Sequence, residues 1–236
     1  MIYTDAHCHI LSPATAPSEI AVRVSCATRP AEWESAITNK DDRTFAAIGI
    51  HPWHIANAAP DWETQMYNLL VANPDIMVGE IGLDKYHDNM PAQVQIFTTQ
   101  LEMAAKLRRP IQLHCVGAWD KVLEIFKLHK SSMPPAVIAH AFGGDSMQME
   151  RLANEYNMYF SFGITQPGDK SALRIASAPV SHILSESDTF DSDDEVQRLS
   201  DSVATIAEIH GLPPMDMADT INANLQRILS YVRPIE

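Results

Sequence analysis

The chain has few cysteines, few basic residues and no long apolar run, and each shortage excludes a class of protein. Only three of its 236 residues are cysteine, which is too few and too scattered for a disulfide framework or a thiolate zinc cluster. Lys and Arg number 17 against 30 Asp and Glu, so the formal net charge is −13. This balance excludes a broad basic surface for duplex DNA. It says less about a small cleft, where bound divalent cations can reverse the local field.

The apolar runs and the start of the chain bear on location. No run approaches the roughly 20 apolar residues that cross a bilayer, and no basic segment followed by an apolar stretch opens the sequence. We therefore expect a cytoplasmic protein with no membrane contact and with reduced, buried cysteines.

What the chain does contain is a regular alternation of short apolar runs with amphipathic stretches. In residues 91–109 apolar side chains recur at helical spacing, and residues 118–130 form a second amphipathic stretch. Runs with the length and composition of buried strands cover residues 2–9, 21–27, 45–51, 76–82, 110–115, 136–142, 158–164 and 182–187.

Strands that alternate with helices pair in parallel through right-handed crossovers. About eight such units predict a (β/α)8 TIM barrel, in one domain over residues 1–236, with its active site at the carboxyl ends of the strands. A doubly wound open sheet is the alternative, but the sequence has no Gly-rich dinucleotide turn to support it.

Two histidines lie one residue apart in the first predicted strand, in the stretch "TDAHCHI". Residues i and i+2 of a strand face the same side, so His7 and His9 are expected to share a face with Asp5, while Cys8 faces away. Two adjacent imidazoles without a shared partner are poorly satisfied, which makes a metal ion one explanation. Packing in the core is the other.

Further metal-compatible residues fall at the ends of other predicted strands, which meet at one rim of a barrel. A lone strand histidine is usually a core residue, but four histidines and two carboxylates at equivalent places on five strands indicate a metal site. Nitrogen and oxygen ligands of this kind suit Zn²⁺, Mn²⁺, Co²⁺ or Mg²⁺, and strand alternation turns Cys8 and Cys115 away. The predicted ligands are His7, His9, Glu80, His114, His140 and Asp188.

The motifs around these residues occur in a specific order: "DAHCH" (5–9), "GIHPWH" (49–54), "GEIGLD" (79–84), "IQLHC" (111–115), "IAHAFGG" (138–144), "SESD" (185–188) and then Asn224. In this set the chain resembles the TatD family of metal-dependent deoxyribonucleases in the amidohydrolase superfamily, over nearly its whole length.

The resemblance implies two divalent metal ions per chain, from among Zn²⁺, Mn²⁺, Mg²⁺, Co²⁺ and Ni²⁺. His7 and His9 would hold one ion, and His114 and His140 the other. Glu80 would bridge the two ions, and Asp188 would complete the first site.

The resemblance also implies an enzyme, a hydrolase that cleaves phosphodiester bonds at DNA ends or in single strands with a water activated by the two ions. Asp188 would orient that water and take its proton. His51 would bind a phosphate oxygen or shuttle a proton, unless it is only packed beneath the loop that contains Pro52. Asp84 and Glu186 could orient ligand histidines.

Three departures from the family pattern favour a second substrate class. Val116 stands where the family often has an Arg, Ser187 replaces the usual Thr, and residues 189–195 are acidic. The alternative is therefore a hydrolase of a small ester, lactone or amide that uses the same metals. A metal-binding scaffold without catalysis is a third possibility, and no obligate protein partner is expected.

Overall fold

The strands form one parallel sheet in chain order. The computed structural model of the protein describes residues 1–12, 15–164 and 169–232. Neighbouring strands pair in parallel from the first to the eighth. They are β1 (Tyr3–Cys8), β2 (Ile20–Ala27), β3 (Thr44–Ile48), β4 (Met77–Asp84), β5 (Ile111–Val116), β6 (Val137–Ala139), β7 (Met158–Phe162) and β8 (Ile183–Ser185).

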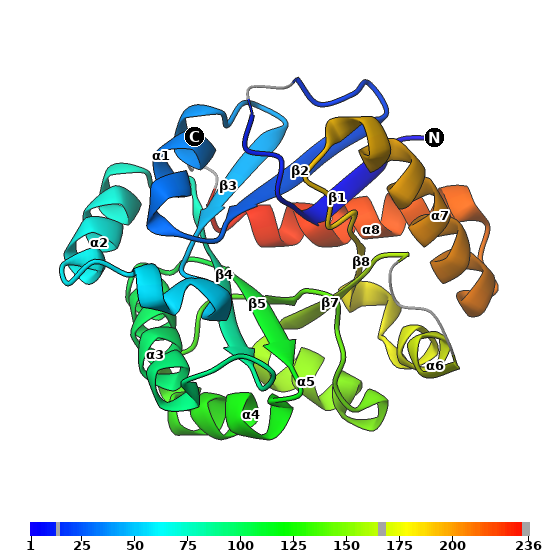
Figure 1. Ribbon diagram of the computed structural model, residues 1–236. Coiled ribbons are helices and arrows are strands. Elements are labelled where there is room, and N and C mark those ends of the chain that lie inside the picture. Colours follow the sequence, from blue (N-terminus) through cyan, green and yellow to red (C-terminus); the bar gives the residue numbers. More distant parts are fainter. Residues whose placement is uncertain (13–14, 165–168, 233–236) are drawn as a thin grey trace.

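Hydrogen bonds between β1, β8 and the residues that follow these strands bring the two edges of the sheet together. Figure 1 shows the arrangement of the strands. The Ser185 hydroxyl donates to the carbonyl of Thr4 at 2.9 Å. The backbone N–H of Asp188 donates to the carbonyl of His7 at 3.0 Å, and that of His9 to the carbonyl of Thr189 at 2.8 Å. The structure therefore confirms the predicted (β/α)8 barrel.

Helices follow β2 to β8 and cover the outside of the barrel (Figure 1), whereas β1 leads to β2 without a helix among the described residues. The α-helices are α1 (Pro30–Thr38), α2 (Trp62–Ala72), α3 (Met90–Lys106), α4 (Trp119–Leu128), α5 (Met149–Tyr156), α6 (Asp169–Ser177), α7 (Ser192–His210) and α8 (Pro214–Leu229). Short 3₁₀ turns are η1 (Pro52–Asn57), η2 (Lys130–Ser132), η3 (Ser146–Gln148) and η4 (Val180–His182).

Local sequence sets where these helices begin and end. The Asn89 side chain accepts from the N–H of Ala92 at the start of α3, where a proline occupies the first turn. Asp191 caps α7 in the same way, and Gly211 ends that helix with a left-handed backbone.

The last helix links the end of the chain to the barrel. Leu225, Ile228 and Leu229 of α8 pack against buried residues of several strands. The Asn224 amide donates to the carbonyls of Val180 and Ile183 at 2.9 and 2.8 Å. This asparagine belongs to the family motif set, and it holds Val180 and the first residue of β8 against α8.

All eight predicted strands are present, but five of them (β1, β3, β6, β7 and β8) are shorter than the apolar runs that predicted them. β6 ends at Ala139 and β8 at Ser185, so His140 is the first residue after β6 and Asp188 the third after β8. Within the described ranges, no helix combines the length and the apolar character that crossing a bilayer requires.

Candidate metal centre

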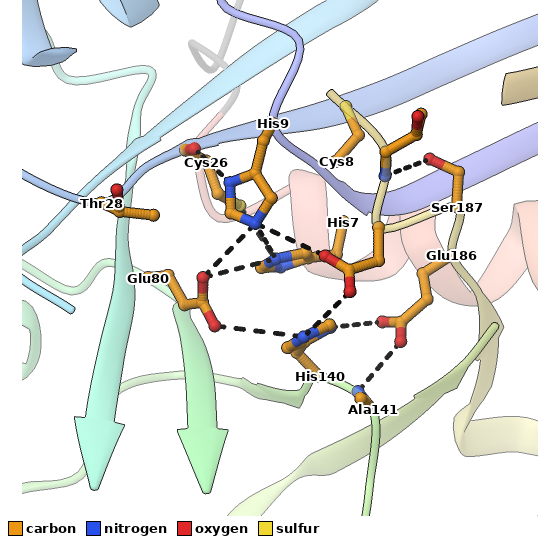
Figure 2. Close-up of polar contacts among 12 residues, drawn as sticks. His7, Cys8, His9, Cys26, Thr28, Glu80, His140, Ala141, Glu186 and Ser187 are labelled. Atoms are coloured by element: carbon orange, nitrogen blue, oxygen red, sulfur yellow. Dashed lines mark hydrogen bonds and ion pairs between the residues drawn. The ribbon is translucent and has the colours of Figure 1, made fainter. Parts of the chain in front are cut away.

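The barrel brings all six predicted ligands to the carboxyl ends of its strands. His7, Glu80 and His114 lie within β1, β4 and β5, respectively. His9, His140 and Asp188 follow β1, β6 and β8. Figure 2 shows four of these side chains, His7, His9, Glu80 and His140, turned toward one another.

The first two histidines point the same ring nitrogen at each other. The Nε2 atoms of His7 and His9 lie 3.3 Å apart. The Nδ1 of His9 donates to the backbone carbonyl of Cys26 at 2.9 Å, which can only accept. The Nδ1 of His7 lies 3.2 Å from the Gln112 Oε1, and the Gln112 Nε2 donates to the Ala6 carbonyl at 2.7 Å.

This arrangement assigns the proton on both rings. The amide of Gln112 is oriented by its bond to a carbonyl, so its oxygen is the acceptor for His7. Each neutral ring then carries its proton on Nδ1 and presents a lone pair at Nε2. Two lone pairs at 3.3 Å repel unless a proton or a metal cation lies between or beside them. Burial lowers the pKa of His9, but Asp188 and Glu80 outweigh it and raise the pKa. A divalent metal would replace the proton that these carboxylates favour, so the pair fits such an ion.

The carboxylate of Glu80 separates two groups of ring nitrogens. Its Oε2 lies 3.6 Å from the Nε2 of both His7 and His9. Its Oε1 lies 3.0 Å from the Nδ1 of His114 and 4.0 Å from the Nε2 of His140. Burial raises the pKa of Glu80, but His7 and the other imidazoles outweigh it and hold the pKa well below its usual range. An ionised carboxylate with nitrogens at both oxygens can bridge two cations.

Two glycines set the position of Glu80 by letting β4 approach β5 closely. Gly79 and Gly82 have positive φ angles of 149° and 153°. A Cβ at Gly79 would lie 2.4 Å from the Gln112 Cβ, and one at Gly82 would lie 1.8 Å from the His114 carbonyl oxygen. Residues with a side chain would push the strand that carries Glu80 away from the strand that carries His114.

A second carboxylate orients His140. The Nδ1 of His140 lies 2.9 Å from the Glu186 Oε2, and the other oxygen accepts from the Ala141 N–H at 3.0 Å (Figure 2). Burial lowers the pKa of His140, but Glu186 and the other nearby carboxylates raise it to about 10. The ring therefore holds a proton that a metal at Nε2 would replace.

Asp188 closes the first half of the cluster and faces the cavity. Its Oδ1 lies 3.5 Å from the His9 Nε2, and about a third of its side chain (34%) is exposed. Burial raises its pKa, but the neighbouring imidazoles, His9 first and then His140 and His7, lower it to about 2. This carboxylate is thus ionised and reachable from solvent.

The second half of the cluster contains an orphaned nitrogen. The Nε2 of His114 is buried without a hydrogen-bond partner, 3.5 Å from the Asp84 Oδ2. If a cation occupies Nδ1 in place of a proton, Nε2 carries the proton and faces this carboxylate. The donor set therefore fits a metal here as well.

His51 enters the same half with a different role. Its Nδ1 accepts from the Trp53 N–H at 3.1 Å, so the proton of the neutral ring lies on Nε2, which is 3.5 Å from the Glu80 Oε1. Burial lowers the pKa of His51 to about 3 and keeps the ring neutral. His51 thus presents a hydrogen-bond donor beside the cluster.

Asp5 does not share the cavity face with the two histidines, contrary to the expectation from strand alternation. The pairing of β1 with β2 shifts register between Asp5 and Cys8, so strict alternation fails there. The Asp5 carboxylate accepts from the backbone N–H groups of His7 and Ser187 at 3.1 and 3.0 Å. It lies with Cys8 and Glu195 behind the cluster and ties β1 to the segment that follows β8.

The cluster forms the floor of a cavity of about 280 Å³. Sequence reasoning missed several of its walls, among them Arg29, Trp53 and Phe190. Arg29 follows β2, so its place at a strand end was a usable signal, whereas the two aromatic side chains depend on loop conformation. The lining residues are His9, Thr28, Arg29, Glu32, His51, Trp53, His54, Glu80, His114, His140, Asp188 and Phe190.

The fold and the cluster define a class: a (β/α)8-barrel protein with a candidate metal centre of imidazoles and carboxylates at the carboxyl ends of its strands. The family described as TatD related DNase matches residues 4–230. The chain belongs to this family.

Similar proteins support this family assignment. The chain is 30% identical over 120 residues to the 3'-5' ssDNA/RNA exonuclease TatD of Erwinia billingiae, which covers 50% of this chain and 45% of the relative. It is 34% identical over 139 residues to the human 3'-5' RNA nuclease TATDN2, covering 55% of this chain and 17% of the relative. The matched part thus spans about half the length of the bacterial relative or less.

Solved structures match over the whole fold. The Escherichia coli TatD homologue YJJV superposes with a TM-score of 0.83 at 23% identity, covering 96% of this chain and 97% of that one. A TatD family hydrolase from Entamoeba histolytica gives 0.78 at 13% identity, covering 97% and 98%. At these identities the likeness establishes the shared barrel.

Proposed function

We propose that the chain is a metal-dependent phosphodiesterase that hydrolyses single-stranded nucleic acid, DNA in particular, from an end. This proposal rests on the positions of the imidazole nitrogens, which lie in two groups, one near each carboxylate oxygen of Glu80. His7 and His9 lie 3.6 Å from one oxygen, and His114 lies 3.0 Å from the other. Many enzymes that hydrolyse phosphodiesters use a pair of metal ions, and a shared carboxylate would hold such a pair.

The residues that would hold the ions follow from this division. His7, His9 and Asp188 would hold one ion, His114 and His140 the other, and Glu80 both. Divalent ions bound there would activate a water molecule and offset the negative charge of the phosphoryl oxygens. Gln112 and Glu186 keep the ring protons of His7 and His140 on Nδ1, so that the Nε2 atoms remain available.

Two residues would act on the substrate directly. Asp188 is ionised, partly exposed and at the cavity floor, so it can orient the attacking water and accept its proton. The Nε2–H of His51 points into the same cavity and can donate to a phosphoryl oxygen as negative charge builds up there.

The residues around the site favour a substrate with a free strand end. Val116, at the end of β5, offers no charge to a phosphate, but the Arg29 guanidinium lines the cavity and can bind one. A formal charge of −13 disfavours long duplex contacts. Relatives named as single-strand exonucleases support the same substrate class.

Hydrolysis of end-labelled oligonucleotides tests the proposal. Single-stranded DNA, single-stranded RNA, duplex DNA, a lactone and an acyl-amide are each incubated with protein loaded with Mn²⁺, Mg²⁺ or Zn²⁺, or treated with EDTA. We expect progressive shortening of single strands that needs metal and is lost in His140→Asn but kept in His182→Asn, a histidine outside the cavity. Turnover of the lactone or amide alone would favour the small-substrate alternative. No turnover with any metal would favour a scaffold.

A further inference from the structure

Two aromatic side chains stand exposed at the mouth of the cavity. The Trp53 side chain follows β3 and is 55% exposed, and the Phe190 side chain follows β8 and is 76% exposed. Both line the cavity whose floor holds the candidate ligands. Exposed apolar side chains that line the same polar cavity can mark a ligand-binding groove.

Trp53 is held in a fixed orientation. Its indole Nε1 donates to the Asp84 Oδ2 at 2.7 Å. His87 stacks on the ring with centroids 4.8 Å apart and planes 26° apart, and His51 meets it edge-on at 5.0 Å. The ring is thus oriented before any ligand arrives, which lowers the entropic cost of binding.

Phe190 is placed by the segment that carries Asp188. Its ring stacks on His9 with centroids 4.6 Å apart and planes 19° apart. The neighbouring Thr189 accepts the His9 N–H through its carbonyl at 2.8 Å and the Asp191 N–H through its hydroxyl at 3.1 Å. Phe190 therefore contacts a candidate ligand directly while most of its surface stays open to solvent.

The cavity that both rings line also carries a positive charge that a phosphodiester can use. Arg29 lines it and is held by Glu32, with the guanidinium Nε 2.7 Å from the Glu32 Oε1. The volume of the cavity, about 280 Å³, lies slightly below the roughly 300–1,000 Å³ of small-molecule sites. It therefore suits a phosphate and its sugar, with the attached bases left at the rim.

We propose that Trp53 and Phe190 each stack a nucleobase of the substrate strand, one on either side of the phosphodiester that is cut. The inference rests on the proposed function and adds how the strand is recognised. Stacking uses the face of a base, so it accepts any base and changes affinity about 5- to 150-fold for each one. Both faces of a paired, stacked base are covered in duplex DNA, so the two rings select unpaired nucleotides without any basic surface.

The test compares a normal strand with one that has no bases. Metal-loaded protein binds a fluorescein-labelled tetrathymidylate or the corresponding abasic tetramer, both with phosphorothioate linkages, and affinity is read from anisotropy. We expect Trp53→Ala and Phe190→Ala each to weaken binding of the thymidylate about 5- to 150-fold and to leave the abasic strand unchanged. Trp53→Phe and Phe190→Tyr should retain most of the affinity. Tyr231→Ala, an exposed aromatic residue outside the cavity, is the control.

Two further measurements keep the outcomes distinct. The chain has four tryptophans, so quenching of fluorescence by the strand that disappears in Trp53→Phe and persists in Phe190→Ala would place a base on Trp53. Equal loss of affinity for the normal and abasic strands would overturn the stacking inference. Failure of the wild type to cut phosphodiester-linked versions of either strand would instead overturn the proposed function.

Discussion

The Nε2 atoms of His7 and His9 face each other across 3.3 Å, while His9 gives its other ring N–H to a carbonyl of β2 and His7 faces the Gln112 oxygen on β5. The strands thus hold two ring nitrogens that need a proton or a metal cation beside them. The barrel framework itself sets this arrangement, which fits a divalent ion.

The number of ions follows from the two sides of Glu80. We expect elemental analysis of protein reconstituted with Zn²⁺ or Mn²⁺ to find about two ions per chain. His9→Ala should lose the ion on the Oε2 side, and His114→Ala the ion on the Oε1 side, so each variant should retain about one. Unchanged occupancy in either variant would show that the corresponding site is assigned wrongly.

Gln112 should affect metal affinity although it is not a ligand. Gln112→Leu keeps a buried side chain of similar size but removes the acceptor that holds the His7 proton on Nδ1. Loss of such a partner typically weakens metal binding about 10- to 100-fold. Titration calorimetry measures this, with Gln197→Leu on the exposed face of α7 as the control. An affinity equal to the wild type would mean that the tautomer of His7 is set by another group.

Asp188 and Glu80 should respond differently to excess metal. Glu80→Gln removes the charge shared by both ions, so its defect is in metal binding, and Mn²⁺ should restore part of the activity. Asp188→Asn keeps an oxygen donor but removes the proton acceptor, so it should stay roughly 10²–10⁴-fold slow at saturating metal. Activity is measured against Mn²⁺ concentration at fixed substrate. Full recovery of Asp188→Asn would point to His51 as the base.

The metal-free protein should lose stability as pH rises. Nearby carboxylates raise the pKa of His140 from its ordinary ~6.5 to about 10. The stabilisation from its protonated ring is therefore fully present below pH ~6.5 and disappears as pH rises through about 10. Melting temperatures in EDTA between these limits should fall with pH, and Glu186→Gln should flatten the dependence. A wild-type curve as flat as that of Glu186→Gln would contradict the assignment.

The ion pair between Arg23 and Glu195 should matter for folding more than for catalysis. The two side chains are almost completely buried, with Nη1 and Oε2 3.1 Å apart. Glu195→Leu removes one member of a buried pair, which typically costs about 3–5 kcal/mol. The double variant Arg23→Met/Glu195→Leu should recover much of that loss. Urea unfolding of the single and double variants decides between this coupling and independent contributions.

How far the sequence sufficed can be judged from particular residues. The place of His114 and Asp188 in the cluster could be predicted because the carboxyl ends of parallel strands meet at one rim, so position along a strand was enough. The side of β1 on which Asp5 lies could not be predicted, since it depends on a register shift that leaves no trace in composition. The partner of His9 is the backbone carbonyl of Cys26, a group that every residue has.

The rim of the cavity shows the same limit. Trp53 and Phe190 lie in segments whose course is set by hydrogen bonds to Asp84 and His9, which become visible only in the folded chain. Strand periodicity locates the floor of such a site, while its walls depend on loop geometry.

Hydrogen bonds between β1 and the segment after β8 join a part of the chain that is synthesised early with one that is synthesised late. The Asp188 N–H reaches the carbonyl of His7, and Asp5 holds the backbone of Ser187. During translation His7 and His9 leave the ribosome long before Asp188, so the candidate site that these three residues form is incomplete until nearly the whole barrel has emerged. A chain interrupted before residue 188 would carry the histidine pair without this carboxylate.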